Sequence, residues 1–128
     1  MIKALTSPNL PAPRFRYSPL VKSGPFYTTA GMIALDQASG DLEPGGAGPE
    51  TTRILSNLMA ALPDFELTLD DLVSARIFTT QFDQFPAINA AWEDVFAAGD
   101  RLPARTAVGV SALPLGATVE MEFAFYKT

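Results

Sequence analysis

The stretch PARTAVGVSALPLGATVEMEFAFY, residues 103–126, decides the fold class of the C-terminal part of the chain. Each of its two ends alternates apolar or small residues with polar ones, which is the pattern of a strand with one face in a core. In the second strand the apolar face consists of Val119, Met121, Phe123 and Phe125. Glu120 and Glu122 then point to the opposite face, so we predict a strand that separates a core from a polar surface.

A hairpin between these two strands would bring an arginine close to the carboxylates. The intervening segment, residues 112–117, contains a proline and a glycine, which favour a turn. In a hairpin Arg105 would share a face with Glu120 and Glu122, with small residues leaving room between them. An arginine fork beside a carboxylate suits a small planar acid whose reacting carbon requires a water molecule.

The same pattern has a structural interpretation. Arg105 could form a cross-strand ion pair with Glu120 or Glu122 on a solvated sheet face, where such a pair contributes little stability. The alternation of side chains does not distinguish this ion pair from a binding site, so both interpretations stay open.

Hydrophobic periodicity predicts three further strands and two helices in the rest of the chain. The order is β-β-α-β-α-β-β, typical of an α+β fold in which two helices pack on one face of a mixed sheet. The expected strands are 15–22, 26–35 and 72–80; the expected helices begin near Pro49 and Asp83 and end at Pro63 and Gly99. Residues 1–14 contain three prolines and no periodicity, so we expect an N-terminal arm on a single domain spanning residues 1–128.

The composition excludes several classes of chemistry. The 128 residues include no cysteine and no histidine, which rules out thiolate nucleophiles, histidine bases and the usual zinc sites, and we predict neither metal nor cofactor. The formal net charge of -5 offers no basic surface for a nucleic acid. The N-terminal residues lack an apolar signal core and no segment is suited to spanning a membrane, so we expect a cytoplasmic protein.

Several motifs resemble the Rid (YjgF) family of reactive-intermediate deaminases, and the match covers nearly the whole chain. Tyr17-Ser18 resembles the Pro-Tyr-Ser that precedes the first hairpin of the family. The segment TAGMIALD at 29–36 resembles its Ser-Gly-Gln-Ile-Pro-Leu-Asp segment, and ETTRILSNL at 50–58 resembles the helix that follows. Pro103-Ala104-Arg105-Thr106 and Val119-Glu120-Met121-Glu122 resemble the most diagnostic pieces.

This resemblance implies a chorismate-mutase-like homotrimer with clefts between subunits that hydrolyses 2-imino acids or enamines to 2-keto acids and ammonia. It implies that Arg105 anchors the substrate carboxylate and that Glu120 positions or activates the attacking water. Tyr17 is then a third catalytic residue that donates a hydrogen bond. Substrate contacts are expected at Gly31, Arg105, Thr106 and Ala107. Some members are described as ribonucleases, which the negative charge of this chain disfavours.

The chain departs from the family pattern at four positions. Ala30, Met32, Ala107 and Gly109 stand where many deaminases have serine, glutamine, cysteine or serine, and glutamate. The loss of polar lining puts the identity of the substrate in doubt more than the type of reaction. The alternative is a protein of the same family that binds or senses small carboxylates without turning them over.

Overall fold

The alternating residues near the C-terminus form β6 (Val119–Tyr126), an inner strand of the sheet in the computed structural model, which describes residues 1–97 and 101–128. Within these residues the sheet has six strands in the order β1-β2-β3-β6-β4-β5. The other strands are β1 (Ile2–Leu5), β2 (Leu20–Ser23), β3 (Phe26–Thr29), β4 (Leu72–Thr79) and β5 (Ala104–Gly109). Neighbouring strands are antiparallel except for β4 and β5, which are parallel.

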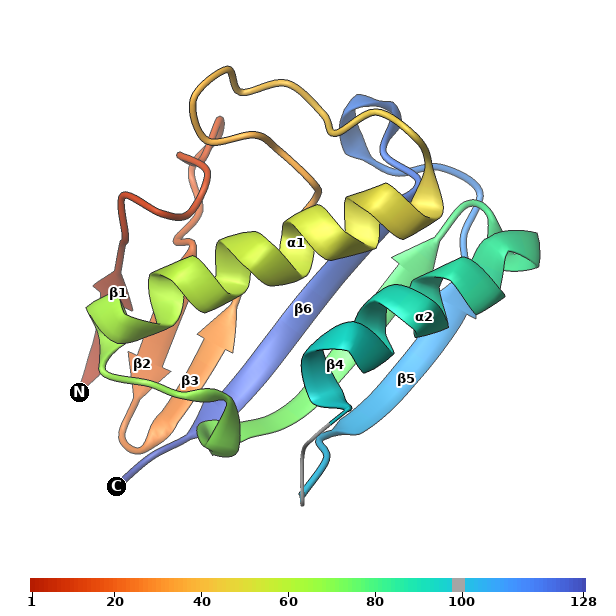
Figure 1. The fold of residues 1–128 in the computed structure, drawn as a ribbon. Helices are drawn as coiled ribbons and strands as arrows, with labels where there is room; N and C mark the ends of the chain where they lie inside the picture. Colours follow the sequence, from red (N-terminus) through yellow and green to blue (C-terminus); the bar gives the residue numbers. More distant parts are fainter. Residues whose placement is uncertain (98–100) are drawn as a thin grey trace.

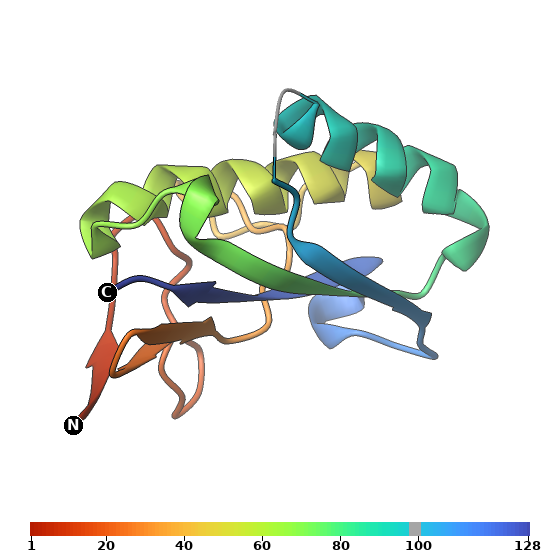
Figure 2. The same ribbon diagram turned by 90° about the horizontal axis from the view of Figure 1, so that it is seen from below.

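Two helices, α1 (Ala47–Ala61) and α2 (Phe85–Phe96), cover one face of the sheet (Figures 1 and 2). The core between these layers contains the predicted apolar face of β6, whose four residues are buried. Ala75 and Ile77 of β4 are buried beside them, together with Ile54 and Leu58 of α1 and Ile88 of α2. The predicted α+β class, with two helices on one face of a mixed sheet, is therefore confirmed.

Several boundaries differ from the predicted ones. The expected strands 15–22 and 26–35 are shorter, because the chain leaves the sheet before Leu20 and after Thr29. The N-terminal arm contributes an edge strand, β1, which pairs with β2. Helix α2 begins after Gln84 rather than being capped by Asp83, and its expected end at Gly99 lies outside the described residues.

Strand β5 does not form the expected hairpin with β6. Helix α2 connects β4 to β5 as a crossover between parallel strands, so β5 pairs with the outer edge of β4. β6 instead lies between β3 and β4. The different positions suit the two sequences: five of the six β5 residues are exposed, as at a sheet edge, whereas β6 is buried along one face.

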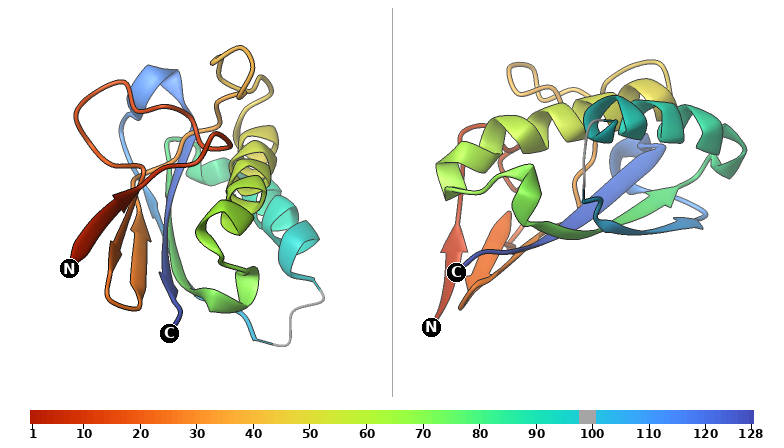
Figure 3. Two further views of the ribbon diagram at one scale, coloured as in Figure 1. Left: turned by 90° about the vertical axis from the view of Figure 1, so that its left-hand side faces the viewer. Right: turned by 60° about the horizontal axis from the view of Figure 1, so that its bottom comes forward.

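The remaining short elements are 3₁₀ turns: η1 (Leu62–Phe65), η2 (Leu69–Asp71), η3 (Phe82–Gln84) and η4 (Pro114–Gly116). Two further views show both helices on the same side of the sheet, with β1 at one edge (Figure 3). The arm is fastened to η1, because the side chains of Ser7 and Asn9 both donate hydrogen bonds to Oδ2 of Asp64, over 2.5 and 3.0 Å. In the described residues, no helix is long and apolar enough to cross a membrane.

A buried carboxylate joins α1 to the start of β6. Glu50, 2% exposed, accepts hydrogen bonds at Oε1 from the backbone N–H of Thr118 and of Val119, over 2.9 and 3.3 Å. Its Oε2 accepts one from the Thr118 hydroxyl, over 2.7 Å. These three bonds satisfy the backbone immediately before Glu120 and fix where β6 begins.

We predict that Glu50→Ala lowers the free energy of unfolding by about 2–4 kcal/mol, because it leaves buried donors without an acceptor. Glu50→Gln should cost less than about 1 kcal/mol, because the amide keeps one oxygen for the two N–H groups and the Thr118 hydroxyl can turn to accept. Urea denaturation of both variants measures the difference. Equal destabilisation by alanine and glutamine would show that the hydrogen bonds are not the reason Glu50 is buried.

Candidate functional site

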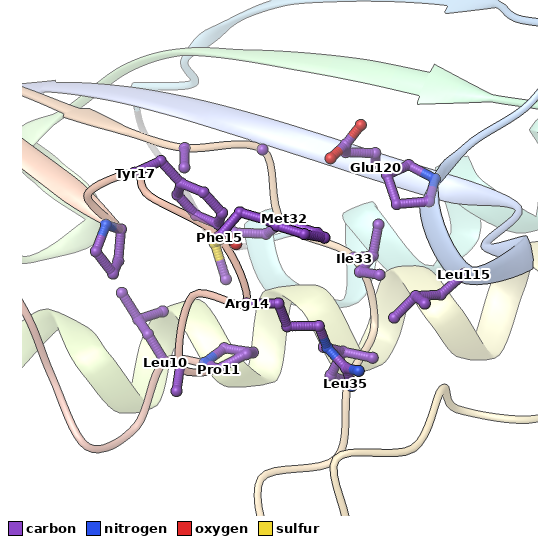
Figure 4. A pocket seen from close by; sticks show the side chains of 15 residues that line it. Leu10, Pro11, Arg14, Phe15, Tyr17, Met32, Ile33, Leu35, Leu115 and Glu120 are labelled. Atoms are coloured by element: carbon purple, nitrogen blue, oxygen red, sulfur yellow. The ribbon is translucent and has the colours of Figure 1, made fainter.

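A pocket of about 370 Å³ lies beside the first half of β6 (Figure 4). Its walls come from the N-terminal arm, the irregular segment 15–19 that follows it, the segment 30–35 that follows β3, the η4 turn and Glu120. Among the described residues that line it, Arg14, Tyr17 and Glu120 have polar side chains and the others are apolar or glycine. A concave, mainly apolar pocket with a few convergent polar groups is the usual form of a small-molecule site.

Glu120 is the carboxylate of this pocket. It is half-buried on the sheet face opposite the helices, where its strand neighbour on β4 is Phe78. Burial raises the pKa of Glu120 above its ordinary value of 4.5, and the negative charge of Glu122 raises it further. A carboxyl group with a raised pKa in a pocket is suited to accept and return a proton at neutral pH.

Gly31 lies directly against Glu120. The backbone of the next residue, Met32, exchanges two hydrogen bonds with Met121, over 2.7 and 2.9 Å, which fixes segment 30–35 alongside β6. A Cβ atom at Gly31 would lie 2.5 Å from Oε2 of Glu120 and 2.8 Å from its Cδ. Glycine is therefore required at this position for the carboxylate to occupy its place in the pocket.

Tyr17 lines the same pocket from the irregular segment between the N-terminal arm and β2. It lies in an irregular segment instead of the strand expected for 15–22, and its backbone N–H donates to the carbonyl of Phe15 over 3.0 Å. Its side chain is half exposed. The structure thus brings Tyr17, Gly31 and Glu120 to one pocket, as expected for three of the candidate residues.

Arg105 lies elsewhere. It lines a second hollow, of about 310 Å³, between α2 and β5. Its Nη2 donates to Oδ1 of Asn89 over 2.8 Å, and its guanidinium carbon lies 5.3 and 5.2 Å from the ring centres of Phe85 and Trp92. The aromatic faces and the amide hold the guanidinium in one orientation. No ion pair found in residues 1–97 and 101–128 includes Arg105.

The prediction that Arg105 shares a sheet face with Glu120 and Glu122 is wrong within one subunit. Arg105 is in register with Ala75 and points to the helix-covered face, whereas Glu120 and Glu122 are in register with Phe78 and Arg76 and point to the other face. The error follows from pairing β5 with β6 instead of with β4.

The alternative interpretation of Arg105, a cross-strand ion pair with Glu120 or Glu122, changes as well. Glu122 forms its ion pair with Arg76 of β4, over 3.1 Å, and not with Arg105.

The two residues that follow Arg105 point to opposite faces of the sheet. Thr106 is exposed on the uncovered face, and Ala107 is partly buried toward the helices. Thr106 and Ala107, both expected to contact substrate, thus lie on β5 away from the Glu120 pocket.

Comparison with known proteins places this fold and pocket in a family. The family model described as Endoribonuclease L-PSP matches residues 7–126. The chain belongs to the Rid family. A RutC family protein of Pyrococcus abyssi is 33% identical over 117 residues, which is 91% of each chain. The 2-iminobutanoate/2-iminopropanoate deaminase of Mus musculus is 31% identical over 120 residues, 94% of this chain and 87% of the relative.

A solved structure of a Rid family protein of unknown function from Yersinia pestis superposes with a TM-score of 0.92 at 30% identity, covering 98% of this chain and 99% of that one. The Rid fold of the present chain is therefore shared over its full length. The family includes proteins named as imine deaminases, which supports enzymatic activity at the level of the family.

Two features of the candidate site in this Rid protein were not predicted from the sequence. Arg14 belongs to the arm, yet it lines the Glu120 pocket and donates to the carbonyl of Gly40 over 3.2 Å. The side chains that hold Arg105 were the second feature not predicted, although their spacing in the sequence indicates that they lie together. Phe85, Asn89 and Trp92 follow the spacing i, i+4, i+7 and therefore form one stripe of α2, which faces β5.

We predict that Gly31→Ala displaces the Glu120 carboxylate toward solvent while the fold persists, because Gly31 is exposed and its backbone is not in the left-handed region. Loss of burial should lower the pKa of Glu120 toward its ordinary 4.5, which an NMR carboxyl titration measures. Gly48→Ala is the control, because its Cβ meets Ala87 at 3.4 Å instead of a carboxylate. An unchanged Glu120 titration in Gly31→Ala would contradict this packing.

Proposed function

We propose that this Rid protein hydrolyses 2-imino acids or their enamine tautomers to 2-keto acids and ammonia without a cofactor. The observation that carries the proposal is Glu120, a carboxylate with a raised pKa that lies against Gly31 in the larger pocket. The relatives named as 2-iminobutanoate/2-iminopropanoate deaminases support this reaction class. The match of residues 7–126 to the family model supports carrying the activity over to this chain.

The chemistry requires one carboxylate and one water. The water oxygen bonds to C2 of the protonated imine as the C=N electron pair moves to nitrogen, and Glu120 takes the proton that the water loses. Glu120 then returns this proton to the nitrogen. The C–N bond breaks, a carbonyl forms, and the remaining hydroxyl proton passes to the departing ammonia, so that the products are a keto acid and ammonium. Tyr17, at the same pocket, is positioned to donate a hydrogen bond.

Arg105 is proposed to hold the substrate carboxylate. Its guanidinium is already oriented by Asn89 and two aromatic rings, which lowers the cost of ordering it on binding. Because Arg105 and Glu120 line different hollows of one subunit, we propose that a site is completed when Arg105 of the partner subunit approaches the Glu120 pocket. The expected contacts of Thr106 and Ala107 would then come from the same β5 strand.

A homotrimer is the assembly that we propose to form such composite sites. The sheet face that the helices leave uncovered carries exposed apolar side chains, namely Phe26 at 56%, Val108 at 41% and Tyr126 at 44% exposure. An apolar sheet face of this kind is suited to contact between subunits. Light scattering coupled to size exclusion measures the assembly, and a stable monomer would remove the composite site from the proposal.

Two other functions are weighed against hydrolysis. Binding of a small carboxylate without turnover is favoured by the apolar residues Ala30 and Met32 in the pocket. For such a non-catalytic binder, imines would decay no faster in the presence of the protein than they do spontaneously. Cleavage of RNA, suggested by the printed family description, finds no support in the net charge of -5.

Substitutions of Arg105 and Glu120 should have separate effects on binding and turnover. We predict that Arg105→Lys weakens binding of 2-keto acid analogues on the order of 10-fold or more, because lysine keeps the charge but loses the planar two-pronged fork. Glu120→Gln should keep analogue affinity while turnover falls on the order of 100-fold, because the amide does not accept the proton from water. Calorimetry with pyruvate and imine-hydrolysis rates measure both.

Each of the two residues has a matched control. Arg101→Lys alters an exposed arginine that donates to the carbonyl of Asp70, and Glu66→Gln alters an exposed carboxylate that does not line the Glu120 pocket. Both should keep most of the wild-type rate. Full analogue affinity in Arg105→Lys, or full turnover in Glu120→Gln, would remove the roles assigned to these residues.

A further inference from the structure

The Glu120 pocket is larger and less polar than a three-carbon imino acid requires. Its volume of about 370 Å³ lies in the range of pockets that hold drug-sized ligands. The walls away from Glu120 consist of Leu10, Pro11, Leu35 and their apolar neighbours, together with Arg14, whose guanidinium donates to the carbonyl of Gly40 (Figure 4). A substrate with a methyl side chain would leave this apolar volume unfilled, and filling it is favourable in proportion to the apolar area buried.

We infer that this pocket selects 2-imino acids with large apolar side chains, branched or aromatic, over those with a methyl or ethyl group. This inference rests on the proposed hydrolysis and adds the substrate class to it. The Glu120 end of the pocket receives the reacting carbon, and the apolar end receives the side chain. The selected class thus differs from 2-iminobutanoate and 2-iminopropanoate, which the names of several relatives print.

Met32 is the first specificity-determining residue in this arrangement. Its backbone is fixed by the two hydrogen bonds with Met121, and its 7% exposed side chain lines the pocket. A thioether is flexible and polarisable, and it packs well against both aliphatic and aromatic groups. The neighbouring Ala30 adds no polar atom to the wall, so this side of the pocket offers a bound side chain apolar contacts.

Leu115 is the second specificity-determining residue. It lies at the η4 turn with φ 58°, a left-handed conformation that leucine adopts at a cost and asparagine adopts readily. Its side chain is 55% exposed and lines the pocket. An apolar residue therefore stands at a strained position where its side chain contacts the pocket, and Leu115→Asn would remove that contact without a penalty to the fold.

The test compares hydrolysis of imino acids generated from alanine and from leucine by an amino-acid oxidase. For the wild type we expect kcat/KM to be roughly 10-fold or more higher for the leucine-derived imine, because each added methylene in an apolar pocket contributes a discrimination of this order. In Met32→Gln and Leu115→Asn the ratio of the two kcat/KM values should fall several-fold toward one, mainly because kcat/KM for the leucine-derived imine decreases. Met59→Gln and Glu66→Asn are the controls. Met59 is an exposed methionine, and Glu66 is, among the described residues, the other non-glycine residue with a left-handed backbone.

Affinity for product analogues separates this inference from the proposed reaction. Calorimetry should show tighter binding of 4-methyl-2-oxopentanoate than of pyruvate, and the preference should weaken in the two pocket variants but not in the controls. If no imine is hydrolysed while this binding preference holds, the proposed reaction fails and the selectivity stands. Equal or reversed preference for the small ligand in the wild type, or an unchanged preference in both pocket variants, would overturn the inference.

Discussion

Strand β6 forms hydrogen bonds along both of its edges, and the rest of the structure depends on this central position. On one side it pairs with β3 and, farther along, with Met32; on the other it pairs with β4. Because β6 is held on both sides and its start is fixed by Glu50, the side chain of Glu120 has a defined place and direction. The bridge at Met32 then brings Gly31 under the carboxylate, which makes one wall of the pocket.

The position of β6 between β3 and β4 also separates Arg105 from Glu120. β6 occupies the inner edge of β4, so β5 pairs with the outer edge, and the crossover through α2 directs Arg105 toward the helices. Asn89, Phe85 and Trp92 hold it there without an acidic partner in the described residues. In the proposed reaction the oriented guanidinium and the carboxylate act on one substrate, and a second subunit would bring the two hollows together.

Residue patterns predicted much of this arrangement and failed at identifiable points. The alternation of Val119 to Phe125 specifies which side chains face the core, but it does not specify which strands lie beside β6. The right-handed crossover rule could have corrected the error, because a strand, a helix and a second strand in succession favour a parallel pair, here β4 and β5. The contributions of Leu10 and Arg14 to the pocket were not predictable, since these residues line it only because segments distant in the sequence come together.

The most direct test of the account is subunit mixing. Arg105→Lys keeps Glu120, and Glu120→Gln keeps Arg105, so the proposed trimer, if built from both variants, would contain some sites with two intact residues. After exchange of subunits at equal amounts, with mixed assembly verified by mass spectrometry, we expect recovery of roughly a quarter of the wild-type imine-hydrolysis rate per subunit, the random share of intact pairs in a cyclic assembly. A mixed assembly that stays at the rate of the two parents would contradict a site shared between subunits.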